Sequence, residues 1–495
     1  MSNERQLIRT LVDPTIVLDD LQMMDTENGS ATSIGSPTSP VSMAKQIGGV
    51  SPLVQINNRA FESEQIVSME IRCEGDRPSA TVSFSVRDKS FYSTSFPKDG
   101  DLMSIFVRSK DDLFKPIRND YEITSVNVYP RPGGGENTPE DMTISGLLRV
   151  PGLDAEKCFS DHGTSMDIIM NASTALKLGF ATNEVSTADE QTWICPFEKT
   201  SDFLYNVTLS AWKDEQSFFT YFLDHYYCVN FVNVDPLFSE KPEIDDALAL
   251  NLLTNDYGKD SVQAKFKGKN VLTNWDDASS TNFYIQSYSL VNNSATVNMR
   301  EGYRRFSRYY DAFIKESQNL YVDPLTTPGS ERDQIIMKGR PGEDFYLEQI
   351  RSKWMGVQYG KDGENSHPKI NYAKINNYQN MVHLQKMYLQ VSLESVNFNL
   401  RRFQVIPVVI VIKKDYSRKR INEPVDESQQ LSSPNPDEPN REKTALSFEE
   451  TPITLDKTVC GYYVIRDIIY KYNKGKFTQD CVLFRREWPT PPQLY

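Results

Sequence analysis

The stretch from Cys460 to Pro489 constrains the fold most, because it carries the clearest local pattern in the chain. Two runs rich in Tyr, Val, Ile and Phe flank Asn473-Lys474-Gly475. Asn and Gly tolerate the positive φ that a tight antiparallel reversal requires, and apolar runs on both sides of such a turn are typical of strands. The sequence therefore predicts a β-hairpin here.

An earlier stretch repeats the pattern of this hairpin. Its first strand has apolar residues at the same spacing, a Pro/Gly turn follows from Pro130 to Gly135, and a second apolar strand ends at Arg149-Val150-Pro151, which parallels Glu487-Trp488-Pro489. An apolar strand entered through a turn also precedes each hairpin, at 97–108 and at 401–412. The sequence predicts that one supersecondary unit occurs twice, with chance similarity of two hairpins as the alternative. The matched positions are Tyr121, Ile123, Val126 and Val128 with Tyr463, Ile465, Ile468 and Tyr470.

Alternating strands surround the first of these hairpins. The region 65–107 reads as a meander with turns near 75–78 and at Asp99-Gly100. Five or six antiparallel strands remove their exposed edges best by curling into a barrel. We therefore predict a mainly β fold with α/β insertions, in which two related small antiparallel β-barrels are joined by helical or mixed insertion domains.

Composition changes along the chain divide it into five parts. Residues 1–50 are expected to be a flexible N-terminal docking segment, with a short helix within 1–24 and a Ser/Pro-rich tether at 25–43. The other predicted parts are a first β-barrel at 51–151, an α/β insertion domain at 152–240, a mixed domain with loops at 241–376, and a second β-barrel at 377–495 whose acidic loop at 415–456 is disordered.

Helical periodicity appears chiefly in the middle of the chain. It predicts helices over 165–178, 200–212 and 217–227, the last leading into a strand at 228–234. A further helix is expected at 377–386. The segment 302–315 carries Arg304, Arg305 and Arg308 among aromatic residues, which can bind nucleic acid but at helical spacing are more typical of an amphipathic face.

Charge and cysteine usage restrict the function class. The net charge of −13 argues against a dedicated nucleic-acid binder. Six cysteines without close spacing are typical of reduced thiols and not of a disulfide framework. No signal peptide is recognisable, and the longest apolar run, 405–412, is shorter than the about 20 residues of a membrane span. We expect a soluble protein made in a reducing compartment, with no membrane insertion.

The sequence holds no recognisable catalytic motif. Cys158 and His162 are near neighbours and could form a thiol nucleophile with its base, which leaves a thiol hydrolase as a remote alternative. The adjacent pairs Asp245-Asp246 and Asp276-Asp277 are more typical of turns than of an acid/base dyad. Four His and no Cys pairs disfavour a metal site. We predict no catalytic, cofactor-binding or metal residues and no enzymatic activity, and the partner-binding residues are not identifiable at this stage.

Several stretches resemble the central baseplate hub proteins of contractile-tailed bacteriophages of the T-even type. They are QTWICPFEKTSDFLYNV at 191–207, SFFTYFLDHYYCVNFVNVDP at 217–236, REGYRRFSRYYD at 300–311, and the closing hairpin with RREWP, together with PKDGD and the strand 404–412. The similarity runs from about residue 50 to the C-terminus and depends on the order of these stretches. The resemblance implies two tail-tube-like barrels per chain in a homotrimeric ring.

The resemblance also implies the partners and the location of such a ring. It would join a six-fold tail tube protein to a three-fold central spike or cell-puncturing protein, within a virion tail baseplate assembled in the host bacterial cytoplasm. Tape measure and neighbouring baseplate proteins are further expected partners, and DNA would meet the protein only in transit, through a channel that the acidic charge could line. The alternatives are another tail-tip or tube-initiation protein of a phage or of a bacterial contractile injection system.

Overall fold

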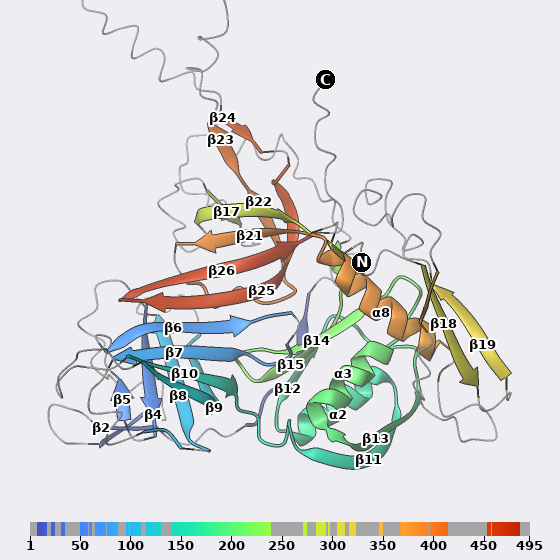
Figure 1. Ribbon diagram of the computed structural model, residues 1–495, viewed down its shortest axis with the longest axis horizontal. Helices are drawn as coiled ribbons and strands as arrows, with labels where there is room; N and C mark the ends of the chain where they lie inside the picture. The colour runs from blue at the N-terminus through green and yellow to red at the C-terminus, as the bar shows by residue number, and fades with distance from the viewer. Residues whose placement is uncertain are drawn as a thin grey trace, which may run out of the picture.

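A computed structural model gives the fold, which is mainly β with few helices (Figure 1) and confirms the predicted fold class. The predicted turn at 130–135, the segment 487–489 and the greater part of the acidic loop lie outside the residues that the structure describes. The structure describes residues 7–16, 21–24, 31–34, 50–57, 59–61, 65–75, 77–87, 96–98, 100–109, 115–129, 141–238, 271–274, 284–293, 296–297, 304–311, 316–322, 346–349, 367, 369–394, 396–413, 453–456 and 458–485.

The largest sheet contains two groups of five strands, which we call unit 1 and unit 2. Unit 1 consists of β6 (Ile66–Cys73), β7 (Thr81–Arg87), β8 (Leu102–Ser109), β9 (Ile117–Tyr129) and β10 (Asp141–Leu148). Unit 2 consists of β17 (Ile285–Asn292), β21 (Met387–Leu393), β22 (Val405–Val409), β25 (Gly461–Asn473) and β26 (Lys476–Phe484). Beyond β8 the sheet continues with β4 (Val50–Ile56) and β5 (Arg59–Phe61), and the short β16 (Leu272–Thr273) pairs with β22.

The strands form where apolar and polar residues alternate. In β7 the side chains of Val82, Phe84 and Val86 are buried while the residues between them are half-buried, as the two faces of a pleated strand require. The same alternation in β10 buries Met142 and Ile144. One face of each strand therefore contributes to the core.

The two units have the same topology. When the strands of each unit are numbered in chain order, the order across the sheet is first, second, fifth, fourth, third in both units, and every neighbouring pair is antiparallel. The predicted hairpins are β9–β10 and β25–β26. This arrangement confirms that one strand pattern occurs twice in the chain.

Irregular features of the backbone repeat as well. The β9–β10 ladder skips Thr124 and the β25–β26 ladder skips Arg466, which are matching positions when Tyr121 is aligned with Tyr463. The first strand of each unit has its own bulge at its second residue, Val67 in β6 and Gln286 in β17. Because a bulge adds one residue and re-aims the strand, two matching bulges show that the copies share local geometry as well as strand order.

The turn that enters the third strand also repeats. In the first turn the Asp101 N–H donates to the Lys98 carbonyl, and the Asp101 carboxylate accepts a hydrogen bond from the Lys98 N–H. In the second turn the Gln404 N–H donates to the Arg401 carbonyl, and the Gln404 side-chain oxygen accepts a hydrogen bond from the Arg401 N–H. The third residue has positive φ in both turns, +84° at Gly100 and +58° at Phe403. Phe403 accepts this strained conformation because its buried ring packs against Phe222 and Phe484.

The closure of the units into barrels is not seen in the described strands. The order across the large sheet runs from β17 to β5 without returning to its start. In unit 2 an isolated bridge joins Thr273 of β16 to Tyr284, just before β17, but no continuous ladder follows it. Among the described strands no closed barrel is present, and unit 1 instead continues into unit 2 through the pairing of β6 with β25.

The region after β10 forms a smaller α/β layer beside the large sheet (Figure 1). Its four-stranded sheet has the order β1 (Arg9–Val12), β12 (Gly179–Thr182), β15 (Cys228–Asn233), β14 (Phe219–Leu223). Helices α2 (Ser165–Ala175) and α3 (Thr200–Ser210) confirm the first two predicted helices, and β11 (Glu156–Gly163) pairs with β13 (Gln191–Lys199). We call the described residues 152–238 the insertion.

Local chemistry explains where α2 and α8 (Ile370–Leu384) lie. The Thr164 hydroxyl accepts a hydrogen bond from the Asp167 N–H and the Asp167 carboxylate accepts one from the Thr164 N–H, which is a capping box at the start of α2. The helix predicted at 377–386 is α8 and begins earlier. Its Asn377 amide donates to the carbonyls of Leu209 and Ala211 at 2.9 and 3.0 Å, which ties α8 to the end of α3.

The N-terminal segment differs from its prediction. Residues 9–12 form strand β1 and not a helix, and they pair antiparallel with β12 of the insertion. Part of the predicted tether also forms a strand, since β3 (Ala31–Ile34) pairs with β2 (Leu21–Met24). The helical prediction failed because four apolar residues at helical spacing cannot outweigh the hydrogen bonds that a sheet edge offers.

Three more predicted elements need correction. The helix predicted at 217–227 is strand β14 followed by a turn, and the segment 302–315 holds strand β18 (Arg304–Asp311), which pairs with β19 (Glu316–Val322) and β20 (Tyr346–Gln349). The strand predicted at 405–412 is divided at Ile410 into β22 and β23 (Val411–Lys413), and β23 pairs with β24 (Ile453–Leu455). Aromatic residues are frequent in 217–227 and 302–315, and they favour strands more than helices.

The turn of the C-terminal hairpin lies within the predicted stretch Asn473-Lys474-Gly475, with Asn473 as the last residue of β25. Asn473 pairs with Lys476, so the two turn residues are Lys474 and Gly475, with φ of +46° and +89°. Two successive residues with positive φ are typical of a type I′ turn, in which Asn-Gly is preferred. Lysine therefore occupies a position for which it is poorly suited.

This turn generates a prediction with opposite signs at adjacent positions. Lys474→Asn is expected to raise the free energy of unfolding by about 0.5 kcal/mol, whereas Gly475→Ala is expected to lower it by about 1–2 kcal/mol because a Cβ disfavours positive φ. An added Cβ at Gly475 would meet no atom within 4 Å, so only backbone strain is changed. Urea denaturation of the two variants measures both shifts, and equal signs would contradict the assigned turn.

Candidate functional site

The junction between the two units is the candidate site, because it decides how the copies are arranged. The C-terminal half of β25 pairs antiparallel with β6 of unit 1, from Ile468 opposite Cys73 to Asn473 opposite Ser68. We call this ladder the seam. In Figure 1 the seam lies between the red hairpin β25–β26 and the blue strands β6 and β7. Neither the strand pairing nor its register was predicted from the sequence.

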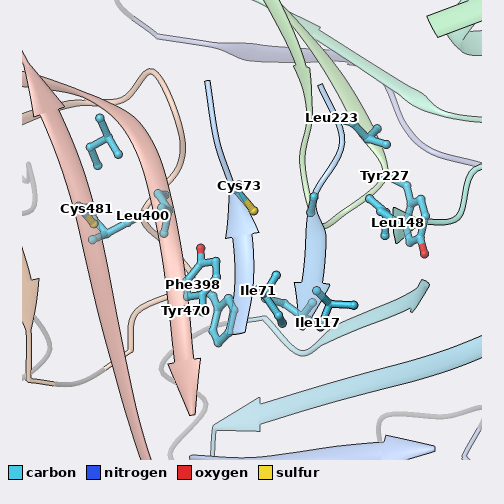
Figure 2. Close-up of a cluster of buried hydrophobic side chains, with 14 of the residues drawn as sticks. Ile71, Cys73, Ile117, Leu148, Leu223, Tyr227, Phe398, Leu400, Tyr470 and Cys481 are labelled. Atoms are coloured by element: carbon cyan, nitrogen blue, oxygen red, sulfur yellow. The ribbon is translucent and has the colours of Figure 1, made fainter. Parts of the chain in front are cut away.

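Apolar side chains from three parts of the chain meet at the seam. Figure 2 shows Ile71 and Cys73 of unit 1 near Tyr470 and Cys481 of unit 2, with Tyr227 among the insertion residues on the other side. The ring of Phe398 stacks on Tyr470 with 4.3 Å between the ring centroids. All of these side chains are buried, so separating the units would expose a continuous core.

A polar contact lies at the end of the seam. The turn after β6 is held by Asp467, whose carboxylate accepts a hydrogen bond from the Gly75 N–H. Arg402 donates to the carbonyl of Arg466, the bulged residue, at 3.1 Å, and its guanidinium lies 4.6 Å from the ring centre of Phe222 in the insertion. The bulge in β25 thus presents a backbone carbonyl to Arg402, and Arg402 in turn contacts the insertion.

The insertion is bonded directly to unit 1. The Leu223 N–H donates to the Pro78 carbonyl at 2.8 Å, the Asn119 amide donates to the His225 carbonyl at 3.0 Å, and the Asp120 N–H donates to the Tyr227 hydroxyl at 3.0 Å. Burial lowers the pKa of His225, which favours the neutral ring. The junction is therefore held by hydrogen bonds between the insertion and unit 1 as well as by apolar contacts.

The thiol and imidazole considered as a nucleophile and its base lie on one strand. Cys158 and His162 both belong to β11, and four residues along a strand span about 13 Å, which is too far for a hydrogen bond. The Nδ1 atom of His162 lies 3.9 Å from a carboxylate oxygen of Glu190. The geometry does not support catalysis by these two residues.

The other sequence candidates do not form a site in the described residues. No group of three or more His, Cys, Asp or Glu side chains arranged to hold a metal ion occurs among them. Asp245-Asp246 and Asp276-Asp277 lie outside the described residues, as do the side chains of Arg304, Arg305 and Arg308. None of the described helices is both long and apolar enough to cross a membrane.

Two strand edges were missed by the sequence interpretation. Val126 and Val128 were identified as apolar positions of a hairpin, but which strand edges lack a partner strand depends on the order of strands across the sheet. One feature of the sequence could have indicated these two edges: Ser125–Tyr129 and Ser287–Asn292 contain no charged residues. Charged residues commonly protect exposed edges, so their lack at an edge is informative.

Comparison with known proteins gave structural matches only. No family model and no curated protein matches the sequence. The fold is similar to a tail protein from Neisseria meningitidis (8% identity, 88% of this chain and 97% of that chain covered, TM-score 0.45) and to a 43 kDa tail protein of prophage MuSo2 from Shewanella oneidensis (8%, 88% and 98%, 0.45). It is also similar to an Escherichia coli component of the type VI secretion system (8%, 89% and 80%, 0.37). All three TM-scores are below 0.5.

The buried carboxyl of Asp467 generates a prediction about pH. Burial is the largest influence on its pKa and raises it. A raised pKa in the folded chain adds stability that is fully present below the unfolded value of about 3.9 and is lost as the pH rises through the folded-state pKa. Asp467→Asn, which keeps the acceptor for Gly75 without a charge, is expected to be more stable than the unaltered protein at pH 7, with the difference closing as the pH falls toward 4.

Chemical denaturation at several pH values measures this difference. As a control, Asp467→Ala removes the acceptor and is expected to be about 1–3 kcal/mol less stable than Asp467→Asn at every pH, because neither variant titrates at this position. A difference between Asp467→Asn and the unaltered protein that does not change with pH would contradict the assignment.

The cysteines generate a prediction about labelling. Cys158 is exposed, whereas Cys73, Cys195, Cys228, Cys460 and Cys481 are buried. Burial also raises the pKa of all five buried thiols, to about 12 for Cys73, so they are protonated at neutral pH. A maleimide reagent is expected to label one thiol per folded chain, and none in Cys158→Ser, as counted by mass spectrometry. Labelling of a second thiol before unfolding would show that the core opens.

Proposed function

We propose that this chain is a structural hub of a phage tail baseplate, forming a trimeric ring that adapts a six-fold tail tube to a three-fold central spike. The observation that carries the proposal is the repeat of one five-strand topology, with matching bulges, in a single chain. The sequence stretches that resemble the hub proteins supply the second support.

The repeat has a direct consequence for symmetry. Three chains with two copies each provide six nearly equivalent positions around an axis, although the chains themselves obey only three-fold symmetry. The insertion and the strands β18–β20 occur once in each chain, so a ring would carry them three times. One assembly can therefore offer a six-fold pattern to a tube and a three-fold pattern to a spike.

The remaining parts of the proposal extend the domain plan. We assign residues 51–151 and 377–495 to the two tube-like domains, 152–240 to the α/β insertion and 241–376 to a mixed domain. Strand β17 comes from 241–376 but pairs with β21, so it joins the second tube-like domain. The segments 1–50 and 415–456 are proposed to contact neighbouring baseplate or tape measure proteins.

The acidic charge suits a channel through which DNA passes. Protein–DNA affinity depends on Lys and Arg contacts to phosphates, and each chain carries a net charge of −13. A ring of such chains would let DNA slide without holding it. The hub is proposed to act in the virion after assembly in the bacterial host.

A second candidate function is a tube-initiation protein or another tail-tip component, in a phage or in a bacterial contractile injection system. The repeat is compatible with these roles, but a protein that starts or forms a tube polymerises or remains a monomer. No observation favours a thiol hydrolase, because Cys158 and His162 are separated along β11.

The oligomeric state distinguishes these candidates. Size-exclusion chromatography with light scattering, alone and together with the spike and tube proteins of the same particle, is expected to give the mass of three chains and a complex that holds three hub chains per spike. The mass of one chain is 56.6 kDa, so one, three and many chains are well resolved. A persistent monomer in the presence of the spike protein, or open-ended polymers, would contradict the hub.

A further inference from the structure

We infer that β17 of one chain pairs antiparallel with β9 of the next chain, in the register that β6 and β25 have inside each chain. The contact between chains thus repeats the seam. The inference rests on the proposed function for the number of chains in the ring, but the contact itself is argued from the two units alone.

The seam shows what such a contact looks like when it is complete. The edge of β25 that faces away from β26 pairs with two strands. Its first residues, 461–464, pair with β22, and its last residues, 468–473, pair with β6 after the bulge at Arg466. The pairing with β6 covers Ile468 and Tyr470, which are 1% and 0% exposed.

Strand β9 has the equivalent edge without the equivalent partner. Its first residues, 117–122, pair with β8 as the first residues of β25 pair with β22. After the bulge at Thr124, no described strand pairs with the outer edge of β9. Val126 and Val128, which match Ile468 and Tyr470, are only half-buried, and Tyr129 is 56% exposed.

Strand β17 is the equivalent of β6, and no described strand forms a ladder with its outer edge, although an isolated bridge joins Tyr284, just before β17, to Thr273 of β16. It is the end strand of the large sheet, and β21 is its neighbour among the described strands. With the two bulges aligned, Tyr288 and Leu290 match Met69 and Ile71 of β6. Met69 and Ile71 are 1% and 5% exposed in the seam, whereas Tyr288 and Leu290 are each 39% exposed.

Both edges have the composition of a contact and not of a free edge. Exposed edge strands are normally protected by charged residues or proline, because unpaired N–H and C=O groups recruit other strands. Ser125–Tyr129 and Ser287–Asn292 contain neither charge nor proline, whereas β6 itself carries Glu70 and Arg72 on its solvent-facing side. The two edges are therefore suited to pair with each other.

The register follows from the alignment of the units. In the seam Tyr470 lies opposite Ile71 and Ile468 lies opposite Cys73. The matching pairs between chains are Val128 with Leu290 and Val126 with Asn292. Since β9 and β17 belong to different units, the contact is head-to-tail, and such contacts form rings when the rotation closes and filaments when it does not.

Disulfide cross-linking tests the register directly. Residues directly opposite in an antiparallel pair have Cα atoms about 4.5–5.5 Å apart, within the range that a disulfide spans. A chain carrying Val128→Cys and one carrying Leu290→Cys, both with Cys158→Ser, are mixed under mild oxidation. A cross-linked pair of chains is expected on a non-reducing gel, and a chain with both cysteines is expected to give closed products of three chains.

A matched control uses Val291→Cys in place of Leu290→Cys, because neighbouring residues of a strand point to opposite faces. Its cross-linking with Val128→Cys is expected to be at least ten-fold lower. A trimer by light scattering without the Val128–Leu290 cross-link would overturn this contact and leave the hub proposal standing. Cross-linked ladders beyond three chains would support the contact and reject the trimeric hub, whereas monomers without any cross-link would reject both.

Discussion

The antiparallel pairing of β6 with β25 is the interaction on which the rest of the structure depends. It joins two strands that are almost four hundred residues apart in the chain, and it makes one sheet of two units. The seam buries Met69 and Ile71 from one side and Tyr470 and Tyr472 from the other. Burial of each such side chain contributes about 1.5–3 kcal/mol, so the units are held as one rigid body and their relative angle is fixed. Arg402 and Asp467 then attach the insertion and the turn after β6 to this body.

The predictions from sequence succeeded where local pattern decides the structure. The hairpin at 461–484 was recognised because alternating apolar residues flank a turn, and its copy at 117–148 because the same spacing recurs. Helices α2 and α3 have enough apolar residues on one face to be identified. Residues 217–227 failed because their aromatic residues fit a buried strand as well as a helix, and residues 9–12 because their conformation is decided by the edge of β12.

The candidate site was largely beyond prediction from the sequence. Ile71 and Tyr470 look like ordinary strand residues, and only the pairing of β6 with β25 reveals that they lie opposite each other. Closure into barrels was expected because small antiparallel sheets must cover their edges. In this chain the pairing of β6 with β25 covers one edge of each unit. Hydrophobic periodicity does not reveal this long-range pairing.

The central claim is that the rotation relating unit 1 to unit 2 inside a chain also relates unit 2 to unit 1 of the next chain. Electron cryomicroscopy of the assembled protein, at a resolution that separates strands, measures both rotations. The account predicts about 60° for each, around one common axis, as six equivalent positions require. Units that do not alternate around a shared axis, or two rotations that do not add to one third of a full turn, would contradict it.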